Sequence, residues 1–328
     1  MLDIVLHAAR AQGGYLYRHQ LLDLGLGDRD IAALRRARHL IRLRHGTYAA
    51  AADVEQLTPE QRHLLIAHSI VDKLDGVVMS HHTAAIAHTG TSWGVDLDTI
   101  HLTRVDGRGG RQEAGVAFHV GAVVPDDDVC LVNGRPATVP TRAAVESCSL
   151  SDVEAGMVTA SFIIRTCGCT IEQLRERMHR HERWPGMLNV RLSLGRAEPE
   201  CESVGEVRSL YLLANYGLPR PEIQRELRRS GLLVARPDFL WPAFCHVGEF
   251  DGLMKYGRLN PWSGADVGLV LVEEKRREDA IRALGLGMSR WVWSDLAPAR
   301  AADTAARIAA DLERSRRVHG RNATHVVL

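Results

Sequence analysis

Residues 13–50 read GGYLYRHQLLDLGLGDRDIAALRRARHLIRLRHGTYAA, and their pattern decides which fold the N-terminal part of the chain can form. Apolar side chains at helical spacing predict a short helix over residues 18–24. A further helix is predicted to begin after Gly27, with Asp28 as its N-cap, and to run to about Arg38.

The residues on either side complete this pattern. Residues 2–9 carry apolar side chains at helical spacing, and Gly13 and Gly14 end that first helix. Residues 39–48 mix apolar and basic side chains around Gly46, which predicts two short strands joined by a turn. Three helices followed by a small hairpin form a winged helix-turn-helix, in which the last helix enters the major groove of DNA.

The predicted third helix and the hairpin are strongly basic. Ile31, Leu34 and Ala37 form the expected buried stripe, so the arginines of this helix should point away from it. A local excess of cations is what phosphate neutralisation requires, although a solvated basic face would have the same composition. The candidate DNA-binding residues are Arg35, Arg36, Arg38, Arg42 and Arg44.

The order of these elements, with R-x-G-x-Y at residues 44–48, resembles the N-terminal domain of AbiEi-type antitoxins from bacterial toxin–antitoxin and phage-defence systems. MSHHTAAIAHTG, at residues 79–90, resembles the segment that follows the winged helix in that family. The resemblance implies binding to double-stranded DNA, commonly at a promoter, and a cognate toxin as protein partner. It implies that the first three of these arginines lie on the recognition helix and that Arg42 and Arg44 lie on the wing.

The composition is that of a globular protein with several domains. The chain has 328 residues, of which 45% are hydrophobic and 25% charged, and its net charge is +1. Such a chain is too long for one core, and we expect domains at residues 1–50, 51–197 and 198–328. The sequence contains no recognisable signal peptide and no membrane-spanning run, so a cytoplasmic protein without a membrane partner is expected.

The middle region predicts a small mixed α/β domain. Helical patterns cover residues 60–74, 81–87 and 141–148, and strand patterns cover residues 77–80, 98–105, 116–124, 129–131 and 137–139. Its histidines match no recognised ligand spacing, so dispersed structural histidines are expected: His63, His68, His81, His82, His88, His101 and His119. The six cysteines lack C-x2-C spacing and indicate neither a zinc site nor a disulfide framework.

The C-terminal region contains the stretch RPDFLWPAFCHVGEFDGLMKYG at residues 236–257. Residues 232–240 and 245–250 are strand-like, and residues 241–244 lie at the turn between them. If Ala243 and Phe244 form the tip of this hairpin, residues equally far from the tip lie opposite each other.

That register brings carboxylates together. Asp238 lies opposite Glu249, and Asp251 faces the same side as Glu249 because side chains alternate along a strand. Three carboxylates on one sheet face need a cation, a proton or solvent, and oxygen ligands at this density suit Mg²⁺. The alternative is that the carboxylates serve turn geometry and salt bridges to Lys275, Arg276 and Arg277.

Residues 202–296 resemble the PD-(D/E)xK nuclease fold, and in particular its branch near the very-short-patch-repair endonucleases. A glutamate in a predicted helix precedes the acidic hairpin, and residues 273–296 resemble the closing helix and strand of that branch. By this resemblance Glu206, Asp238 and Glu249 occupy the acidic positions, and Gln224 matches a recurring glutamine before the hairpin.

One position departs from the family pattern. The lysine expected two residues after Glu249 is replaced by Asp251. Lys255 could reach back to act in catalysis with Glu206, Asp238 and Glu249, while Asp238, Glu249 and Asp251 hold the metal. Alternatively, the site has lost activity and Lys255 only neutralises Asp251.

We therefore expect an α+β protein with a winged helix, a mixed middle domain, and a C-terminal sheet flanked by helices. The first functional hypothesis is a DNA-binding regulator or antitoxin in which the nuclease-like domain assists binding. The second is a Mg²⁺-dependent endonuclease directed to DNA by the winged helix. Palindromic operators are usually read by dimers, which makes a homodimer one of the expected forms.

Overall fold

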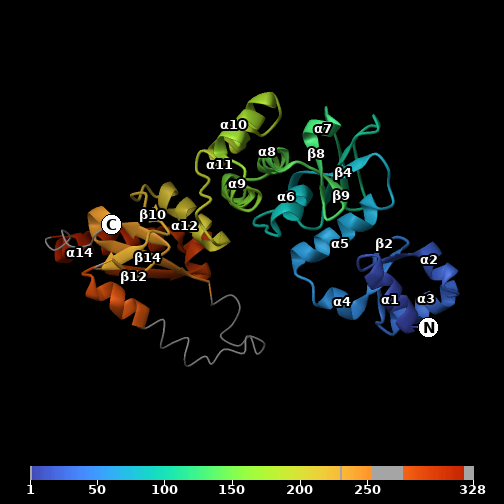
Figure 1. Cartoon of the computed structure of the whole chain (residues 1–328), viewed down its shortest axis with the longest axis horizontal. Helices are drawn as coiled ribbons and strands as arrows, with labels where there is room; N and C mark the ends of the chain where they lie inside the picture. Colours follow the sequence, from blue (N-terminus) through green and yellow to red (C-terminus); the bar gives the residue numbers. More distant parts are fainter. Residues whose placement is uncertain (1, 230, 253–275, 321–328) are drawn as a thin grey trace. The chain divides into compact units, whose positions relative to one another are not determined.

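The computed structural model describes residues 2–229, 231–252 and 276–320, and these residues mix helices and sheets as expected for an α+β protein. The chain divides into two compact units, Met1–Gly195 and Arg196–Leu328, whose elements are labelled in Figure 1. This division lies two residues before the expected start of the C-terminal domain, whereas the expected boundary after residue 50 lies inside the first unit.

The first unit begins with three helices and a three-stranded antiparallel sheet of order β1-β3-β2. In chain order these elements are α1 (Leu2–Ala11), β1 (Leu16–Tyr17), α2 (Arg18–Asp23), α3 (Asp28–Arg36), β2 (Leu40–Arg44) and β3 (Thr47–Ala50). Gly46, at φ 71°, forms the turn between β2 and β3. The three helices and the hairpin that the sequence predicted are present, with the short strand β1 added before α2.

Two details of the predicted third helix were wrong, namely its N-cap and the burial of Ala37, and its end lies two residues before Arg38. Gly27 is the N-cap of α3, and the Asp30 side chain accepts a hydrogen bond from the Gly27 backbone N–H at 2.8 Å, so Asp28 is the first helical residue. The helix ends at Arg36 because Arg38 has a left-handed backbone, with φ 56°. Ala37 is exposed at the C-cap and does not extend the buried stripe.

The winged helix has its own core and packs on the next helices. Every one of its helices and strands contributes to one buried cluster: Val5, Ala9, Leu16, Leu21, Leu26, Ile31, Leu40 and Tyr48. A second cluster joins it to α4 (Ala51–Glu55) and α5 (Pro59–Val71) through Tyr15, Tyr17, Ala49, Val54 and Leu65.

A six-stranded mixed sheet of order β6-β7-β5-β4-β9-β8 follows. Its elements in chain order are β4 (Val77–Met79), α6 (His81–Thr89), β5 (Ile100–Arg104), β6 (Arg111–Glu113), β7 (Val116–Val120), α7 (Pro125–Asp128), β8 (Val129–Val132) and β9 (Arg135–Thr138). The predicted helices and strands of this region are confirmed, with ends displaced by a few residues.

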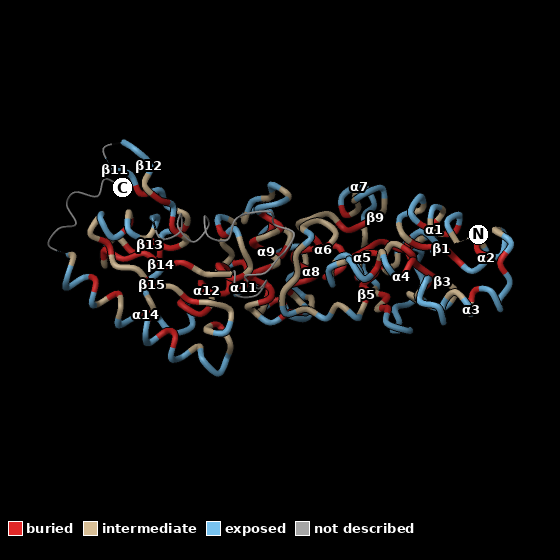
Figure 2. Tube along the Cα trace, turned by 90° about the horizontal axis from the view of Figure 1, so that it is seen from below, coloured by how far each residue is buried: buried red, intermediate tan, exposed pale blue. Residues whose placement is uncertain are grey.

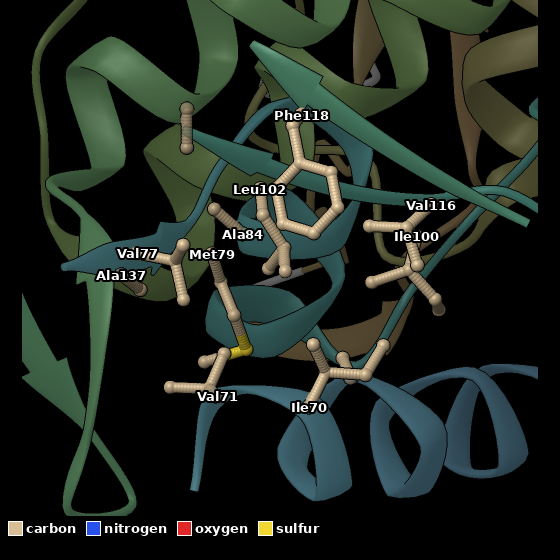
Figure 3. Close-up of a cluster of buried hydrophobic side chains, with 12 residues drawn as sticks. Ile70, Val71, Val77, Met79, Ala84, Ile100, Leu102, Val116, Phe118 and Ala137 are labelled. Carbon is tan, nitrogen blue, oxygen red and sulfur yellow. The ribbon is translucent and has the colours of Figure 1, made fainter. Parts of the chain in front are cut away.

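Alternate residues of β5 and β7 point to opposite sides of this sheet. Ile100, Leu102, Val116 and Phe118 join the apolar cluster with Ile70 and Val71 of α5 (Figure 3). The intervening residues are Ala117 and three polar residues, His101, Thr103 and His119. The two sides of these strands therefore differ in chemistry.

Four helices complete the first unit: α8 (Pro140–Leu150), α9 (Val153–Cys167), α10 (Ile171–Arg180) and α11 (Met187–Leu194). The sequence patterns predicted the first of these helices and gave no prediction for the other three. Buried ion pairs tie α8 to its surroundings: Arg142 lies 2.7 Å from both Glu146 and Asp128.

The second unit contains a four-stranded sheet of order β10-β13-β14-β15. Its elements are α12 (Val204–Asn215), β10 (Glu222–Ile223), β11 (Leu227–Arg229), β12 (Leu232–Ala235), β13 (Phe239–Trp241), the 3₁₀ turn η1 (Pro242–Phe244), β14 (His246–Asp251), a helical segment at 276–283, β15 (Gly287–Val292), η3 (Trp293–Leu296) and α14 (Pro298–His319). Neighbouring strands are antiparallel except β14 and β15, which are parallel.

The hairpin has the predicted register. Phe239 pairs with Gly248 and Leu240 with Val247, so Asp238 and Glu249 occupy the next opposed positions. The predicted strand over residues 232–240 was wrong, because β12 pairs with β11 and only β13 joins the larger sheet. Pro237, which has no N–H to donate to a ladder, lies in the gap between them.

Helices α12 and α14 pack on this sheet, whose strands β13 and β14 are largely buried (Figure 2). Trp291 of β15 donates to Ser209 of α12 at 2.7 Å, and His246 of β14 lies 2.8 Å from Ser315 of α14. The expected sheet flanked by helices is present. None of the helices among the described residues combines the length and apolar composition that crossing a bilayer requires.

Candidate functional site

Four of the five candidate DNA-binding arginines are exposed. Arg35 and Arg36 lie on the last turn of α3, Arg38 follows it, and Arg42 lies on β2. None of these four side chains makes an ion pair with any residue in the described part of the chain. Their charges are therefore not neutralised within the described structure, and α3 and β2 together present a basic surface.

Arg44 differs from the other four. Its Nη2 donates a hydrogen bond of 3.3 Å to the backbone oxygen of Ala114, in the turn between β6 and β7. Burial lowers its pKa from the usual range. Arg44 thus packs against the middle region of its own unit, and its availability for DNA is less than the sequence suggested.

The second candidate site centres on Gln224, which bridges two predicted acidic residues. Its Nε2 donates to Glu206 Oε2 at 3.0 Å and to Asp238 Oδ1 at 3.1 Å. The Gln224 backbone has φ 51°, and its N–H donates to the Asp238 backbone oxygen at 3.1 Å. A helix residue and a hairpin residue that are far apart in sequence are therefore joined, as the nuclease resemblance implied.

Glu206 lies in the first turn of α12, whose N-cap is Ser203. Its Oε2 accepts from the Glu202 backbone N–H at 2.8 Å, and its Oε1 accepts from Ser203 Oγ at 2.7 Å. Ser203 in turn accepts from the Glu206 backbone N–H at 3.2 Å. Ser203 thus satisfies the Glu206 N–H in the first turn of α12, and both Glu206 carboxylate oxygens accept hydrogen bonds.

Glu249 is held by two arginines. Its Oε2 accepts from Arg290 Nη2 at 2.9 Å, and its Oε1 lies 2.7 Å from Arg277 Nη2 in an ion pair. Arg290 is the direct neighbour of Glu249 across the parallel β14–β15 pair. Of the three cations named in the alternative prediction, Arg277 forms a salt bridge to Glu249, Arg276 forms none with these carboxylates among the described residues, and Lys275 lies outside the described residues. Arg290 is a partner that the sequence did not suggest.

Burial dominates the electrostatics of these carboxylates. Burial, followed by the nearby charge of Glu206, raises the pKa of Asp238 to about 6. Burial also raises the pKa of Glu249, while Arg277 and Arg290 act in the opposite direction. One of Asp238's oxygens, Oδ2, accepts from the Phe250 backbone N–H at 2.8 Å, which favours the charged form.

Asp251 and Lys255 are the remaining residues of the predicted acidic site. Asp251 lies at the end of β14, two residues after Glu249, and is half-buried. Lys255 lies outside the described residues. Glu206, Asp238 and Glu249 have the oxygen ligands that Mg²⁺ uses, but the arrangement does not fit a bound ion because Glu249 has an arginine on each oxygen.

Sequence reasoning missed a histidine cluster in the first unit. One ring nitrogen from each of His81, His101 and His119 lies within 4.8 Å of the other two. Burial lowers the pKa of His101 to about 3 and lowers the pKa of the other two rings. The histidines predicted to be dispersed are in part gathered, and only the pairing of β5 with β7 brings the last two together.

The proteins to which this chain is similar have names that state no function. No family model matches the chain. Two Mycobacterium tuberculosis proteins, "Uncharacterized protein MT2308" and "Uncharacterized protein Rv2248", are each 26% identical to it over 283 residues, which is 84% of this chain and 94% of theirs. The crystal structure of RV2827C protein from the same organism aligns with a TM-score of 0.38 and 17% identity, covering 67% of this chain and 82% of that one.

Proposed function

We propose that this protein binds double-stranded DNA through its winged helix and acts as a regulator of the antitoxin type. The observation that carries the proposal is the exposed group Arg35, Arg36, Arg38 and Arg42, which lacks ion-pair partners among the described residues. The resemblance to AbiEi-type antitoxins agrees with it, and a cognate toxin and a homodimeric form belong to the same proposal.

The physical basis is phosphate neutralisation. Each arginine that approaches a phosphate releases condensed counterions, and an arginine without an internal partner gives up no ion pair in doing so. In a winged helix the last helix enters the major groove, so α3 is the expected groove element and β2 belongs to the wing. Phosphate contacts would set the position of α3, and base contacts would set the sequence preference.

The test is a DNA-binding titration with wild type and an Arg35→Ala/Arg36→Ala variant, measured by fluorescence anisotropy at several salt concentrations. The double variant should bind roughly 10-fold or more weakly for each arginine that contacts a phosphate, from about 1.5 kcal/mol per charged hydrogen bond. The slope of log affinity against log salt should flatten by about one unit per lost contact.

Arg10→Ala is the matched control. Arg10 is an exposed arginine of the same domain, but it already pairs with Asp53 at 2.8 Å. It should change neither affinity nor salt slope appreciably. Equal affinity and equal slope for wild type and the double variant would remove α3 as the DNA-binding element.

A second candidate function, a DNA endonuclease, rests on the Gln224-bridged carboxylates. Glu206 and Asp238 share the Gln224 amide, and Glu249 lies at the next position of the hairpin register. Catalysis would require Arg277 and Arg290 to leave Glu249 when a divalent ion binds, and Lys255 to supply the family's missing lysine. The arginine contacts make this the weaker of the two proposals.

Supercoiled plasmid incubated with Mg²⁺ or Mn²⁺ tests the endonuclease directly. An active site predicts nicking that Asp238→Ala and Glu249→Ala abolish and that Lys255→Ala slows. The binding assay runs beside it on the same variants. Absence of nicking by wild type across metal concentrations, with DNA binding intact, would reject the enzyme for those substrates and leave the regulator proposal standing.

A further inference from the structure

We propose that His81, His101 and His119 form a binding site for a divalent transition-metal ion, with Zn²⁺ as the probe. Each residue offers one ring nitrogen, and these three atoms lie within 4.8 Å of one another. The site belongs to the first unit and is independent of both the arginines of α3 and the carboxylates of the second unit.

Three different elements supply the ligands. His101 lies on β5 and His119 on β7, and because these strands are parallel neighbours with Thr103 opposite His119, the two rings project from the same side of the sheet. His81 is the first residue of α6, and its ring stacks on that of His119 with centroids 3.7 Å apart. The ligands are thus fixed on regular elements, which is the arrangement that holds a metal geometry.

The hydrogen-bonded nitrogens of His101 and His119 have a spacing close to that of two metal ligands. His101 Nδ1 and His119 Nε2 face each other 2.8 Å apart. Two imidazole nitrogens at about 2.0–2.1 Å from a tetrahedral ion lie about 3.3–3.4 Å from each other. Rotating the rings apart by roughly half an ångström therefore reaches the ligand spacing, and the His81 ring must also turn out of its stack on His119.

Two further observations point to a ligand here. His81 has a left-handed backbone, with φ 50°, a strained conformation that persists at functional sites where the surroundings enforce it. Thr103 is 2% exposed, and its Oγ1 has no hydrogen-bond partner among the described residues. Thr103 is directly opposite His119 in the sheet, so a water or hydroxide on the ion would give this hydroxyl its missing partner.

Surrounding groups orient the His81 ligand. His81 Nδ1 lies 2.9 Å from Ser80 Oγ and 3.8 Å from Glu146 Oε2. Glu146 also accepts from the His81 backbone N–H at 3.2 Å and is paired with Arg142. Such partners commonly fix the ring of a metal-binding histidine, so Ser80 and Glu146 are positioning residues.

The donor set indicates the class of ion. Three imidazoles without a thiolate suit Zn²⁺, Cu²⁺, Ni²⁺ or Fe²⁺ and do not suit Mg²⁺ or Ca²⁺. Three protein ligands leave a position for water or a small anion, as in open zinc sites. His81 and His101 are each 8% exposed, whereas His119 is half-buried, which gives the ion a route from solvent on the His119 side.

The experiment uses untagged full-length protein treated with a chelator and then dialysed. Competition with a chromophoric zinc chelator gives affinity and stoichiometry, and Co²⁺ substitution gives a visible absorption band if the ion is tetrahedral. Wild type should bind one equivalent. His101→Ala and His119→Ala should each weaken binding by more than the 10–100-fold typical of losing an outer-shell partner, and Ser80→Ala should fall within that range.

His88→Ala is the matched control. His88 lies on the same helix as His81, but its ring bonds the Thr138 backbone oxygen at 2.8 Å and is not part of the cluster. Circular dichroism and thermal unfolding of each metal-free variant exclude misfolding as the cause of lost binding, and half-buried His119 is the most tolerant position. Equal zinc affinity in wild type and the His101→Ala/His119→Ala variant, or no zinc binding by folded wild type, would overturn the proposal and leave a hydrogen-bonded histidine cluster.

Discussion

The arginines at the end of α3 and the buried glutamates of the second unit are arranged in opposite ways. Arg35, Arg36 and Arg38 are exposed and have no ion-pair partner among the described residues. Glu206 and Glu249 are buried; both Glu206 oxygens accept hydrogen bonds, whereas Glu249 accepts one from Arg290 at Oε2 and forms at Oε1 an ion pair with Arg277 that lacks hydrogen-bond geometry. The exposed arginines can contact a ligand without breaking an ion pair among the described residues. The buried glutamates can do so only after a hydrogen bond or an ion pair breaks.

Because of this difference, we expect substitutions in the two regions to affect different measurements, DNA affinity for the exposed arginines and the free energy of unfolding for the partners of the buried glutamates. Removing an exposed, unpaired arginine leaves no buried group unsatisfied, so the free energy of unfolding should change by no more than about 0.5 kcal/mol. Removing a partner of a buried carboxylate leaves a charge that has lost its compensation. The same substitution, arginine to alanine, should therefore affect DNA affinity in one region and folding stability in the other.

The largest expected effect is that of Arg290→Ala. It should lower the free energy of unfolding by roughly 2–4 kcal/mol, because Glu249 stays buried with one of its two cationic partners removed. Urea denaturation measures the loss. In an Arg290→Ala/Glu249→Gln variant the loss should be smaller than the sum of the two single losses, and strict additivity would show that this pair does not carry the stability assigned to it.

An intermediate effect is expected from Asp238→Asn, and it depends on pH. The folded pKa of Asp238, about 6, lies above its unfolded value, so the native state holds the extra proton between about pH 4 and pH 6. Wild type should therefore lose stability as pH rises through this window, by at most about 3 kcal/mol, and the variant should lose less. Urea denaturation across pH measures this, with Glu222→Gln, an exposed carboxylate of β10, as the control. Parallel pH profiles for wild type and Asp238→Asn would contradict the raised pKa.

The smallest expected effect distinguishes two arginines of one strand. Arg42→Ala should flatten the salt dependence of DNA binding by about one unit in log–log slope, because Arg42 is exposed. Arg44→Ala should flatten it by less, because Arg44 donates to the Ala114 oxygen. Equal slopes for the two variants would mean that Arg44 leaves Ala114 when DNA binds.

The sequence predicted best what depends on neighbours along the chain. The position of the turn sets the hairpin register. Counting residues outward from the turn therefore predicts that Asp238 lies opposite Glu249. The order of elements in the winged helix follows from local helical spacing and from Gly46 at the turn. Pro237 is a local signal that the strand over residues 232–240 is interrupted, because proline has no N–H to donate to a ladder.

Contacts between distant segments were not predictable in the same way. Arg290 reaches Glu249 only because β15 lies parallel beside β14. Parallel strands are not joined by a tight turn, so no turn motif in the sequence predicts this pairing. The histidine cluster likewise depends on the parallel neighbours β5 and β7 and on the position of α6. The spacing of these residues along the chain indicates none of these contacts, and the three histidines match no ligand motif in the sequence.

The division of the chain after Gly195 has a consequence for the order of events during synthesis. Both core clusters of the winged helix and the apolar cluster of the middle sheet consist entirely of residues of the first unit. Translation at about 5–20 residues per second leaves on the order of 10 s while residues 196–328 are added. We expect the basic surface of α3 and β2 to be folded on the ribosome before Glu249 and Arg290 have been joined to the chain.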